Sequence, residues 1–314
     1  LNFFFVHEHL QRFLSTVHHR EGAWWYFIPI GLAGFLPWLA LSSALPSVVR
    51  GERRGSGFRP VLLLLVWAAS IFVFFSFSSS KLPGYILPIY PALAIIAALA
   101  LDKLRPAQWG RQVVIAGAFA GCALLSLPLV ARLGSPTAPN ALYRAFVPWL
   151  GAACVLALAG MLVAWRLRSS DPGRSIVVYA LTFFLAETVA LRGHEVFGRI
   201  GSGADLVARI EAVAEPGLPI YSVRVLDHTL PFYLRRTMVI VEEPGELEFG
   251  TRQEPDKWLP TLDLFERRWM SGAHALALMS PQTYELLRQH HLPMTSVAAD
   301  QRRVVVANFE PAPR

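Results

Sequence analysis

Long apolar runs separated by short polar loops fill roughly the first two thirds of the chain, and this pattern stops after Gly193. A helix that spans a bilayer needs about 20 consecutive, mostly apolar residues. Six runs approach or reach this length, near residues 23–46, 60–79, 84–101, 112–131, 145–165 and 175–192. The pattern therefore predicts an α-helical, multispanning membrane protein with six transmembrane helices.

The last part of the chain has a different pattern, in which polar and apolar residues are mixed and no spanning run occurs. β-rich stretches at 218–225, 237–242, 273–279 and 303–309 alternate with helix-like stretches at 203–214, 261–270 and 281–291. Such alternation favours a small α/β domain. The sequence thus predicts three parts: a surface segment at 1–22, a transmembrane domain at 23–195 and an α/β domain at 203–314.

Composition agrees with this division. Apolar residues make up 54% of the chain and charged residues 16%, whereas soluble domains have about 25% charged residues. The net charge of +7 raises nucleic acid as a partner, but the basic residues lie in short loops between apolar runs, so we predict none. The two cysteines, Cys122 and Cys154, lie inside apolar runs and form no disulfide framework or thiolate metal site. Because the chain begins with Leu1 rather than methionine, we expect it to be the C-terminal part of a longer protein.

The charges of the loops predict an orientation. Three loops, 47–59, 102–111 and 166–174, carry most of the arginine and lysine between the spans. The positive-inside rule places such loops in the cytoplasm. Residues 1–22, the loops 80–83 and 132–144, and everything after about 193 would then lie outside. In a bacterium this means an inner-membrane protein with a periplasmic C-terminal domain.

The loop between the second and third spans is a candidate phosphate site. It holds Lys81, and Tyr85 follows four positions later, at the predicted membrane–water boundary. Pro83 suits the first turn of a helix, and the serines at 78–80 are predicted to cap it. An ammonium group, a phenol and a positive helix end would then meet at the depth of a lipid phosphate. The alternative is that Lys81 and Tyr85 are ordinary interfacial anchors.

The N-terminal segment adds a second cation and a histidine cluster. Its aromatic residues predict an amphipathic stretch at the outer surface, and the planar guanidinium of Arg12 suits phosphate oxygens. His7, Glu8 and His9 are potential metal ligands, although adjacent residues do not share one helix face. The alternative for this cluster is a solvated surface helix.

Three segments carry a resemblance to a known family. They are Phe5-Val6-His7-Glu8-His9-Leu10-Gln11-Arg12-Phe13, Lys81-Leu82-Pro83-Gly84-Tyr85-Ile86-Leu87-Pro88 and Leu230-Pro231-Phe232-Tyr233-Leu234-Arg235-Arg236. Together they resemble the bacterial aminoarabinose transferases of lipid A modification. These enzymes belong to the dolichyl-phosphate-mannose–protein mannosyltransferase-like group, which has the GT-C membrane fold.

The resemblance implies a glycosyltransferase that moves 4-amino-4-deoxy-L-arabinose from undecaprenyl phosphate to lipid A, with inversion at the sugar carbon. Arg12 and Tyr85 match positions that hold the phosphate of the lipid carrier, with Lys81 as a companion. His7 matches a position that helps to bind a divalent, zinc-like metal. Members of the family have more spans than this chain, so we expect their catalytic aspartates upstream of Leu1 and the chain alone to be inactive.

Other functions stay open at this level. The acceptor of a polyprenyl-phosphate sugar transferase is in some cases a protein hydroxyl or another glycan. A non-catalytic accessory subunit that keeps the lipid-phosphate site would show the same residues without the upstream carboxylates. A transporter would predict inverted repeats or charged residues in mid-membrane, which the sequence does not favour.

Overall fold

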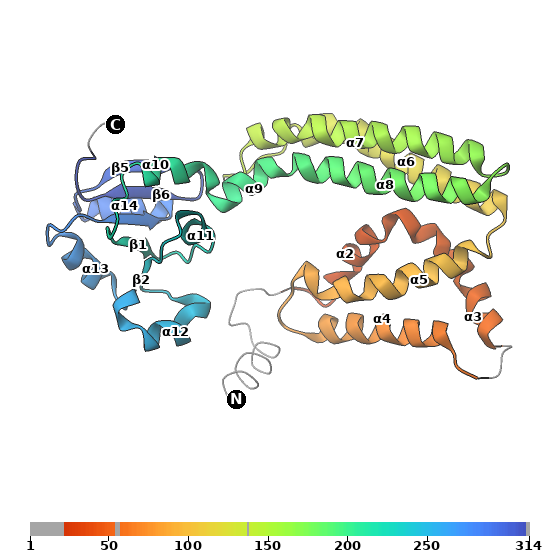
Figure 1. Cartoon of the computed structure of the whole chain (residues 1–314), viewed down its shortest axis with the longest axis horizontal. Coiled ribbons are helices and arrows are strands. Elements are labelled where there is room, and N and C mark those ends of the chain that lie inside the picture. Colours follow the sequence, from red (N-terminus) through yellow and green to blue (C-terminus); the bar gives the residue numbers. More distant parts are fainter. Residues whose placement is uncertain (1–21, 54–56, 137, 312–314) are drawn as a thin grey trace. The chain divides into compact units, whose positions relative to one another are not determined.

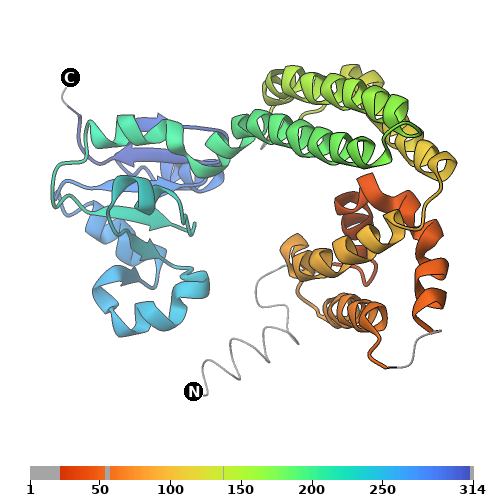
Figure 2. The same cartoon turned by 45° about the vertical axis from the view of Figure 1, so that its right-hand side comes forward.

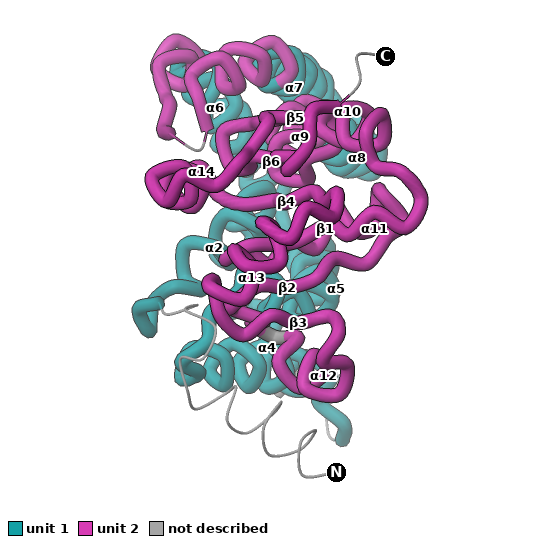
Figure 3. Tube along the Cα trace, turned by 90° about the vertical axis from the view of Figure 1, so that its left-hand side faces the viewer, with its two compact units in different colours: residues 1–126, 150–189 teal, residues 127–149, 190–314 magenta. Residues whose placement is uncertain are grey.

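The computed structural model describes residues 22–53, 57–136 and 138–311 of the chain (Figure 1). The chain divides into two compact units, which Figure 3 draws in different colours. The first unit combines residues 1–126 and 150–189, and the second combines residues 127–149 and 190–314. The boundary between the units falls within long helices.

Five helical segments of the described chain are long and apolar enough to cross a membrane. They are α4 (Pro60–Phe77), η3 with α5 (Pro83–Ile89 and Tyr90–Leu101), α6 (Pro106–Val130), α7 (Asn140–Leu167) and α8 (Pro172–Gly193). The helices α6, α7 and α8 run alongside one another (Figures 1 and 2), and Trp109, Met161 and Tyr179 pack together between them. The multispanning class predicted from the sequence is confirmed.

The first predicted span, 23–46, is not one straight helix. It is formed by α2 (Phe27–Gly34), η2 (Leu36–Ala44) and the start of α3 (Leu45–Arg53), with a bend of 82° at the break. Pro37 lies just after the break and lacks an N–H group for the helical ladder. Its carbonyl oxygen accepts hydrogen bonds from the Gln112 side chain and the Tyr179 hydroxyl. These partners allow a broken helix in an apolar setting, and counting the bent pair as one span gives six.

The C-terminal part contains a six-stranded mixed sheet of order β3-β2-β1-β4-β6-β5. The strands are β1 (Ile220–Val223), β2 (Val239–Val241), β3 (Trp258–Leu259), β4 (Leu276–Met279), β5 (Thr295–Ala299) and β6 (Val304–Ala307). β1 is parallel to β2 and β4, and β2 is parallel to β3, whereas β6 runs antiparallel to both β4 and β5. The four predicted β-rich stretches are confirmed as β1, β2, β4 and β6.

Helices cover both faces of this sheet (Figure 1). Residues alternate between the faces along each strand, as the pleat requires. On one face Tyr221 and Val223 pack against Phe265 and Trp269, both of α13 (Leu262–Trp269), and α14 (Pro281–Gln289) lies on the same face. The opposite face is covered by α10 (Val207–Glu211) and α11 (Leu230–Leu234), whose apolar residues pack against Ile220, Leu276 and Leu278. These two apolar layers are the core of the α/β domain.

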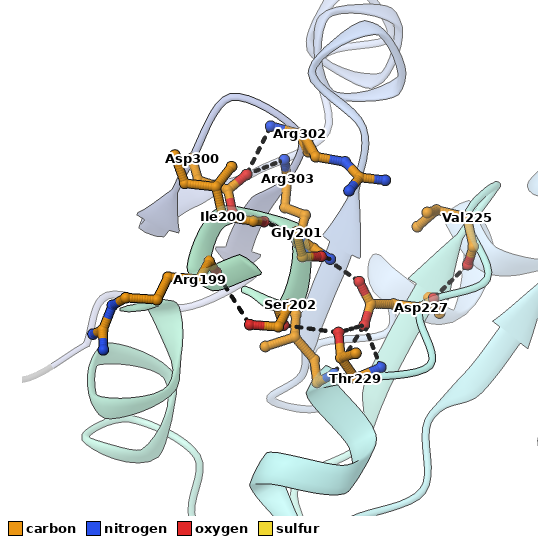
Figure 4. A network of polar contacts seen from close by, with 12 residues as sticks. Arg199, Ile200, Gly201, Ser202, Val225, Asp227, Thr229, Asp300, Arg302 and Arg303 are labelled. Carbon is orange, nitrogen blue, oxygen red and sulfur yellow. Dashed lines mark hydrogen bonds and ion pairs between the residues drawn. The ribbon is translucent and has the colours of Figure 1, made fainter. Parts of the chain in front are cut away.

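A buried polar network ties helix α9 (Glu195–Ser202) to the sheet domain (Figure 4). The Arg303 guanidinium donates to Asp227 Oδ2 at 2.6 Å and to the carbonyl oxygens of Ile200 at 2.8 Å and Gly201 at 2.6 Å. Thr229 donates its hydroxyl to the Ser202 carbonyl at 2.7 Å. The last carbonyls of α9 thus obtain partners from the domain that follows it. The exact limits of the predicted domains at 1–22, 23–195 and 203–314 stay predictions.

Candidate functional site

The candidate site lies at the end of α4, where the predicted serine caps are not found. Helix α4 ends at Phe77, and Ser78 is already extended, with φ −61° and ψ 142°. The residue that precedes the next helical turn is Leu82, which is also extended and makes no side-chain cap. A proline disfavours helical conformations for the residue before it. Pro83 therefore keeps Leu82 extended, and Leu82, rather than one of the serines, is the residue that precedes the first helical turn. The capping prediction was therefore wrong, and the turn at Pro83 is a 3₁₀ helix.

Lys81 is buried, with 5% of its surface exposed, and its ammonium group faces the end of α4. The Nζ atom donates to the carbonyl oxygens of Phe75 at 3.0 Å and Ser76 at 2.6 Å. It also lies 5.4 Å from the centre of the Phe27 ring. A cation at the C-terminal end of a helix satisfies carbonyls that have no helical partner and complements the helix dipole. Lys81 is thus held in place by the backbone rather than extending freely into the surroundings.

Burial lowers the pKa of the Lys81 ammonium from its ordinary value. Removing a charged group from water disfavours its charged form, so burial acts in this direction on a lysine. The two carbonyl contacts leave one of the three N–H donors of the ammonium for another partner. The site therefore presents a fixed cation with donor capacity left.

Two serine hydroxyls beside Lys81 lack partners among the described residues. These are Ser76 Oγ and Ser80 Oγ, and both atoms are buried. A buried polar atom without a hydrogen bond costs about 1–3 kcal/mol. A phosphate oxygen would relieve that cost, because each hydroxyl is able to donate to it. Ser76 was not predicted as a site residue, and Ser80 was predicted only as a helix cap. The run of serines at 78–80, directly after an apolar span, was the feature of the sequence that indicated polar groups at this position.

Tyr85 lies against the same end of α4. Its ring stacks on the Phe75 ring, with the centroids 4.8 Å apart. Lys81 also contacts Phe75, through the carbonyl oxygen of that residue. The structure thus brings the two predicted residues, Lys81 and Tyr85, to the same residue of α4. The side chain of Tyr85 is half-buried.

An apolar depression of about 290 Å³ begins at this site. It is lined by Trp24, Ile28, Phe72, Val73, Ser76 and Phe77, so it runs between α2 with its preceding turn and α4. Ser76 belongs both to this depression and to the polar end next to Lys81. The polar end next to Lys81 would suit the charged head of an amphiphile, and the apolar depression that begins at Ser76 would suit its tail.

The other predicted site residues, Arg12 and His7, lie outside the described residues. Within the described part of the chain no group of three or more His, Cys, Asp or Glu side chains is arranged to hold a metal ion. The predicted metal site thus stays a prediction, as do the roles of Arg12, Lys81 and Tyr85 in phosphate binding.

Comparison with known proteins identifies the chain's relatives. The profile of the Aminoarabinose transferase C-terminal domain matches residues 206–308. A relative from Serratia proteamaculans, named undecaprenyl phosphate-alpha-4-amino-4-deoxy-L-arabinose arabinosyl transferase, is 37% identical over 144 residues, which are 44% of this chain and 25% of that protein. A relative of the same name from Pseudomonas aeruginosa is 38% identical over 138 residues, or 42% of this chain and 24% of that protein.

Solved structures extend the likeness to the whole chain. The crystal structure of ArnT from Cupriavidus metallidurans bound to undecaprenyl phosphate has a TM-score of 0.91 and 46% identity, over 100% of this chain and 57% of that one. The apo structure of the same protein gives a TM-score of 0.89 and 45% identity, over 100% and 56%. The chain thus spans about half the length of the solved relatives and has their GT-C fold. The chain is therefore similar to the C-terminal portion of the aminoarabinose transferases.

Proposed function

We propose that this chain is the C-terminal portion of a membrane glycosyltransferase that moves 4-amino-4-deoxy-L-arabinose from undecaprenyl phosphate to lipid A. The observation that carries the proposal is the buried Lys81 ammonium next to two hydroxyls, Ser76 Oγ and Ser80 Oγ, that have no partner in the described structure. The names of the relatives and the undecaprenyl phosphate bound by a solved relative support this substrate class.

In the proposed reaction, the phosphate of the lipid carrier is the leaving group. Negative charge grows on that phosphate as the bond to the sugar carbon breaks. A cation that is already fixed in position stabilises this charge without reorganising during the reaction. The carbonyls of Phe75 and Ser76 hold Lys81 in this way, and its burial strengthens the interaction because less water screens it. Tyr85 and Arg12 are proposed to donate to the same phosphate.

The apolar depression beside Ser76 is proposed to take the first isoprene units of the carrier. Its lining residues are almost all apolar, and Ser76 marks the end where the phosphate would lie. The acceptor would attack the sugar carbon from the face opposite the phosphate, which inverts that carbon. We expect an upstream carboxylate to position this acceptor. A lipid A phosphate is already ionised, so the carboxylate needs little base strength.

Two finer points belong to the same proposal. His7 would help to hold a divalent, zinc-like ion together with residues outside this chain, and the ion would supply positive charge near the leaving phosphate. The protein would lie in a bacterial inner membrane, with the α/β domain in the periplasm. The several apolar helices support a membrane location.

The test is sugar transfer by the full-length enzyme in lipid vesicles that contain the aminoarabinosyl carrier and lipid A. We expect Lys81→Met to lower turnover roughly 100- to 1,000-fold, the usual cost of removing one fixed electrostatic donor. Tyr85→Phe, which removes only a hydroxyl, should cost about tenfold, because a hydrogen bond to a charged group contributes about 1.5 kcal/mol. Arg12→Ala should also lower turnover severely.

Matched controls separate the site from general damage. Lys103→Met removes an exposed lysine that follows α5, and Tyr143→Phe removes a hydroxyl near the start of α7; both variants should keep normal turnover. Thermal unfolding in detergent checks that Lys81→Met has not lost the fold along with the cap of α4. Near-normal transfer by Lys81→Met and Tyr85→Phe, in folded protein, would overturn the proposed phosphate site.

A further inference from the structure

The α/β domain contains a pocket that the proposed reaction does not use. Its volume is about 270 Å³. Ser222 of β1 and Ile240 of β2 contribute to it from the sheet, Pro231 contributes from α11, and Gly250 contributes from α12 (Glu248–Gln253). It therefore lies on the sheet face that α11 covers, between the short helices α11 and α12.

The apolar part of the lining consists of long aliphatic side chains. Leu226, Met238, Ile240 and Leu247 all contribute to it. Gly250 adds no side chain, and a Cβ atom built there would meet nothing within 4 Å. The pocket is therefore open beside α12 rather than filled by the domain's own core.

The polar side chains of the lining are largely engaged with the protein itself. Asp227 accepts from Arg303 and Thr229, and Ser222 donates to the Val225 carbonyl. Thr251 donates to the backbone of α12 and the preceding turn η5 (Gly245–Leu247), and Lys257 pairs with Glu254. Sugars and nucleotides need polar groups placed to bind them, and here most of the polar lining side chains already have partners within the protein. The lining therefore suits an apolar occupant.

Large exposed apolar side chains lie on the two elements that frame the pocket. Phe232 of α11 is 78% exposed and follows Pro231, which lines the pocket. Phe249 of α12 is 53% exposed and precedes Gly250. Leu247, a lining residue, is itself 45% exposed. Exposed apolar side chains on neighbouring elements mark an interaction site, and exposed Phe and Leu side chains are typical of surfaces that enter the membrane interface.

The chain's own covalent structure favours a lipid over a protein as the occupant. Span α8 ends at Gly193, and only α9 and the short turn η4 (Ala204–Leu206) separate it from the domain core. Arg303 fixes the carbonyls of Ile200 and Gly201, so this connection is not a long free linker. The domain thus follows a membrane-spanning helix after one short helix and one turn, so membrane lipid is a constant neighbour of the tethered domain, unlike a soluble partner.

From these observations we infer that the pocket framed by α11 and α12 binds an acyl chain of a membrane phospholipid, and that Phe232 and Phe249 on these two helices contact the lipid surface. Such binding would hold this part of the domain at the membrane surface. It does not depend on which sugar is transferred or on the acceptor.

Photocrosslinking of the full chain in lipid nanodiscs tests the inference. The probe is a phosphatidylethanolamine–phosphatidylglycerol bilayer that contains phosphatidylcholine with a diazirine on one acyl chain. After irradiation and proteolysis, mass spectrometry locates the lipid adducts. We expect adducts in the lining segments 226–231, 237–240 and 247–251. Their absence from all three segments would overturn the inference, and crosslinking of a co-purified protein there would replace the lipid with a protein partner.

Two variants and their matched controls sharpen the test. Gly250→Leu places a side chain in the open space beside α12, and Leu247→Asp places a charge in the apolar lining; each should lose most of the adducts. Gly198→Leu also meets open space, and Leu264→Asp alters a side chain with 44% exposure; both lie away from the pocket and should keep them. Adducts that persist unchanged in both pocket variants would contradict the assignment. Sugar transfer is measured separately, so failure here leaves the proposed function untouched.

Discussion

At the scale of single residues, Asp227 and Arg303 show how a buried charge is accommodated in the α/β domain. Their side chains are 4% and 7% exposed, and Figure 4 shows Asp227 next to Thr229. Asp227 also accepts hydrogen bonds from the N–H groups of Thr229 and Leu230. Burial alone would raise the pKa of Asp227, but the hydrogen bonds from Leu230 and Arg303 and the Arg303 charge outweigh it, and the pKa falls below its ordinary value. The pair therefore stabilises the folded domain while Asp227 is ionised.

Replacing this carboxylate is expected to destabilise the domain in a pH-dependent way. Asp227→Asn leaves the Arg303 charge buried without its closest counterion, which costs about 3–5 kcal/mol in such pairs. We expect the lower end, since Asp300 stays 3.4 Å from Arg303. The pKa of Asp227 is lower in the folded than in the unfolded protein, where it lies near 3.8. Asp227 therefore contributes its full share to the free energy of unfolding above this unfolded pKa, and this share is lost as the pH falls through the lower folded pKa.

Unfolding of the detergent-solubilised chain between pH 3 and pH 7, followed by tryptophan fluorescence, measures both effects. The difference between the natural chain and Asp227→Asn should be largest at pH 7 and shrink below pH 4. A difference that is independent of pH would show that Asp227 acts through its shape or hydrogen bonds alone. Asp205→Asn, which alters an exposed pair with Arg199, is the control and should change little.

Lys81 shows where reasoning from the sequence succeeds and where it stops. Its place next to Tyr85 at the end of an apolar run was visible in the sequence, and the structure brings both residues to Phe75. Its contacts with the carbonyls of Phe75 and Ser76 were not predictable, because they depend on how the chain folds back after Ser78. The local pattern gave the residue types, whereas their partners followed from tertiary structure.

At the scale of elements, predictions succeeded where a run of residues had a strong pattern of its own. Strands β6 and β1 are rich in β-branched and other apolar residues, with Ser222 of β1 as the polar exception; both strands are buried throughout, and both were predicted. Strand β3 has only two residues, and β5 mixes alanine, serine and threonine with an irregularity between Ser296 and Ala298. These two are edge strands whose existence depends on their neighbours, so the local sequence did not reveal them.

The contact between α7 and α8 predicts a specific sensitivity. A Cβ atom at Gly160 of α7 would overlap the side chain of Thr182 in α8, so the two helices approach closely at this point. Small residues allow such approaches between membrane helices. Gly160→Ala should therefore force the helices apart and destabilise the protein by about 1–3 kcal/mol, the usual cost of overpacking.

Thermal unfolding in detergent, monitored by size-exclusion chromatography after heating, checks this expectation. Gly121→Ala in α6 is the matched control, because a Cβ atom there meets nothing within 4 Å. It should keep or slightly raise the stability, since alanine favours helix over glycine. Equal behaviour of the two variants would mean that α7 and α8 do not depend on this contact.

At the scale of the whole molecule, the number of helices between two loops predicts their sides of the membrane. Residues 80–82 and 131–139 are separated by two apolar segments, η3 with α5 and α6. Two more, α7 and α8, separate residues 131–139 from the α/β domain. If each segment crosses once, Lys81 and the domain share one side, and the positive-inside rule makes it the outer one. With this orientation, the proposed phosphate site would lie on the side of the membrane where the proposed acceptor is exposed.

Single cysteines tested with a membrane-impermeant maleimide decide this topology. Starting from a chain with Cys122→Ala and Cys154→Ala, we would introduce Leu133→Cys, Glu215→Cys and Lys103→Cys, which lie in the loop after α6, in the α/β domain and in the loop after α5. In intact bacterial spheroplasts the first two should be labelled. Lys103→Cys should react only after permeabilisation, because an odd number of crossings separates it from the others. The contrary result would be labelling of Lys103→Cys in intact spheroplasts while Glu215→Cys is protected. It would mean that the orientation is reversed and that the Lys81 site lies on the cytoplasmic side. A periplasmic lipid A acceptor would then be out of reach.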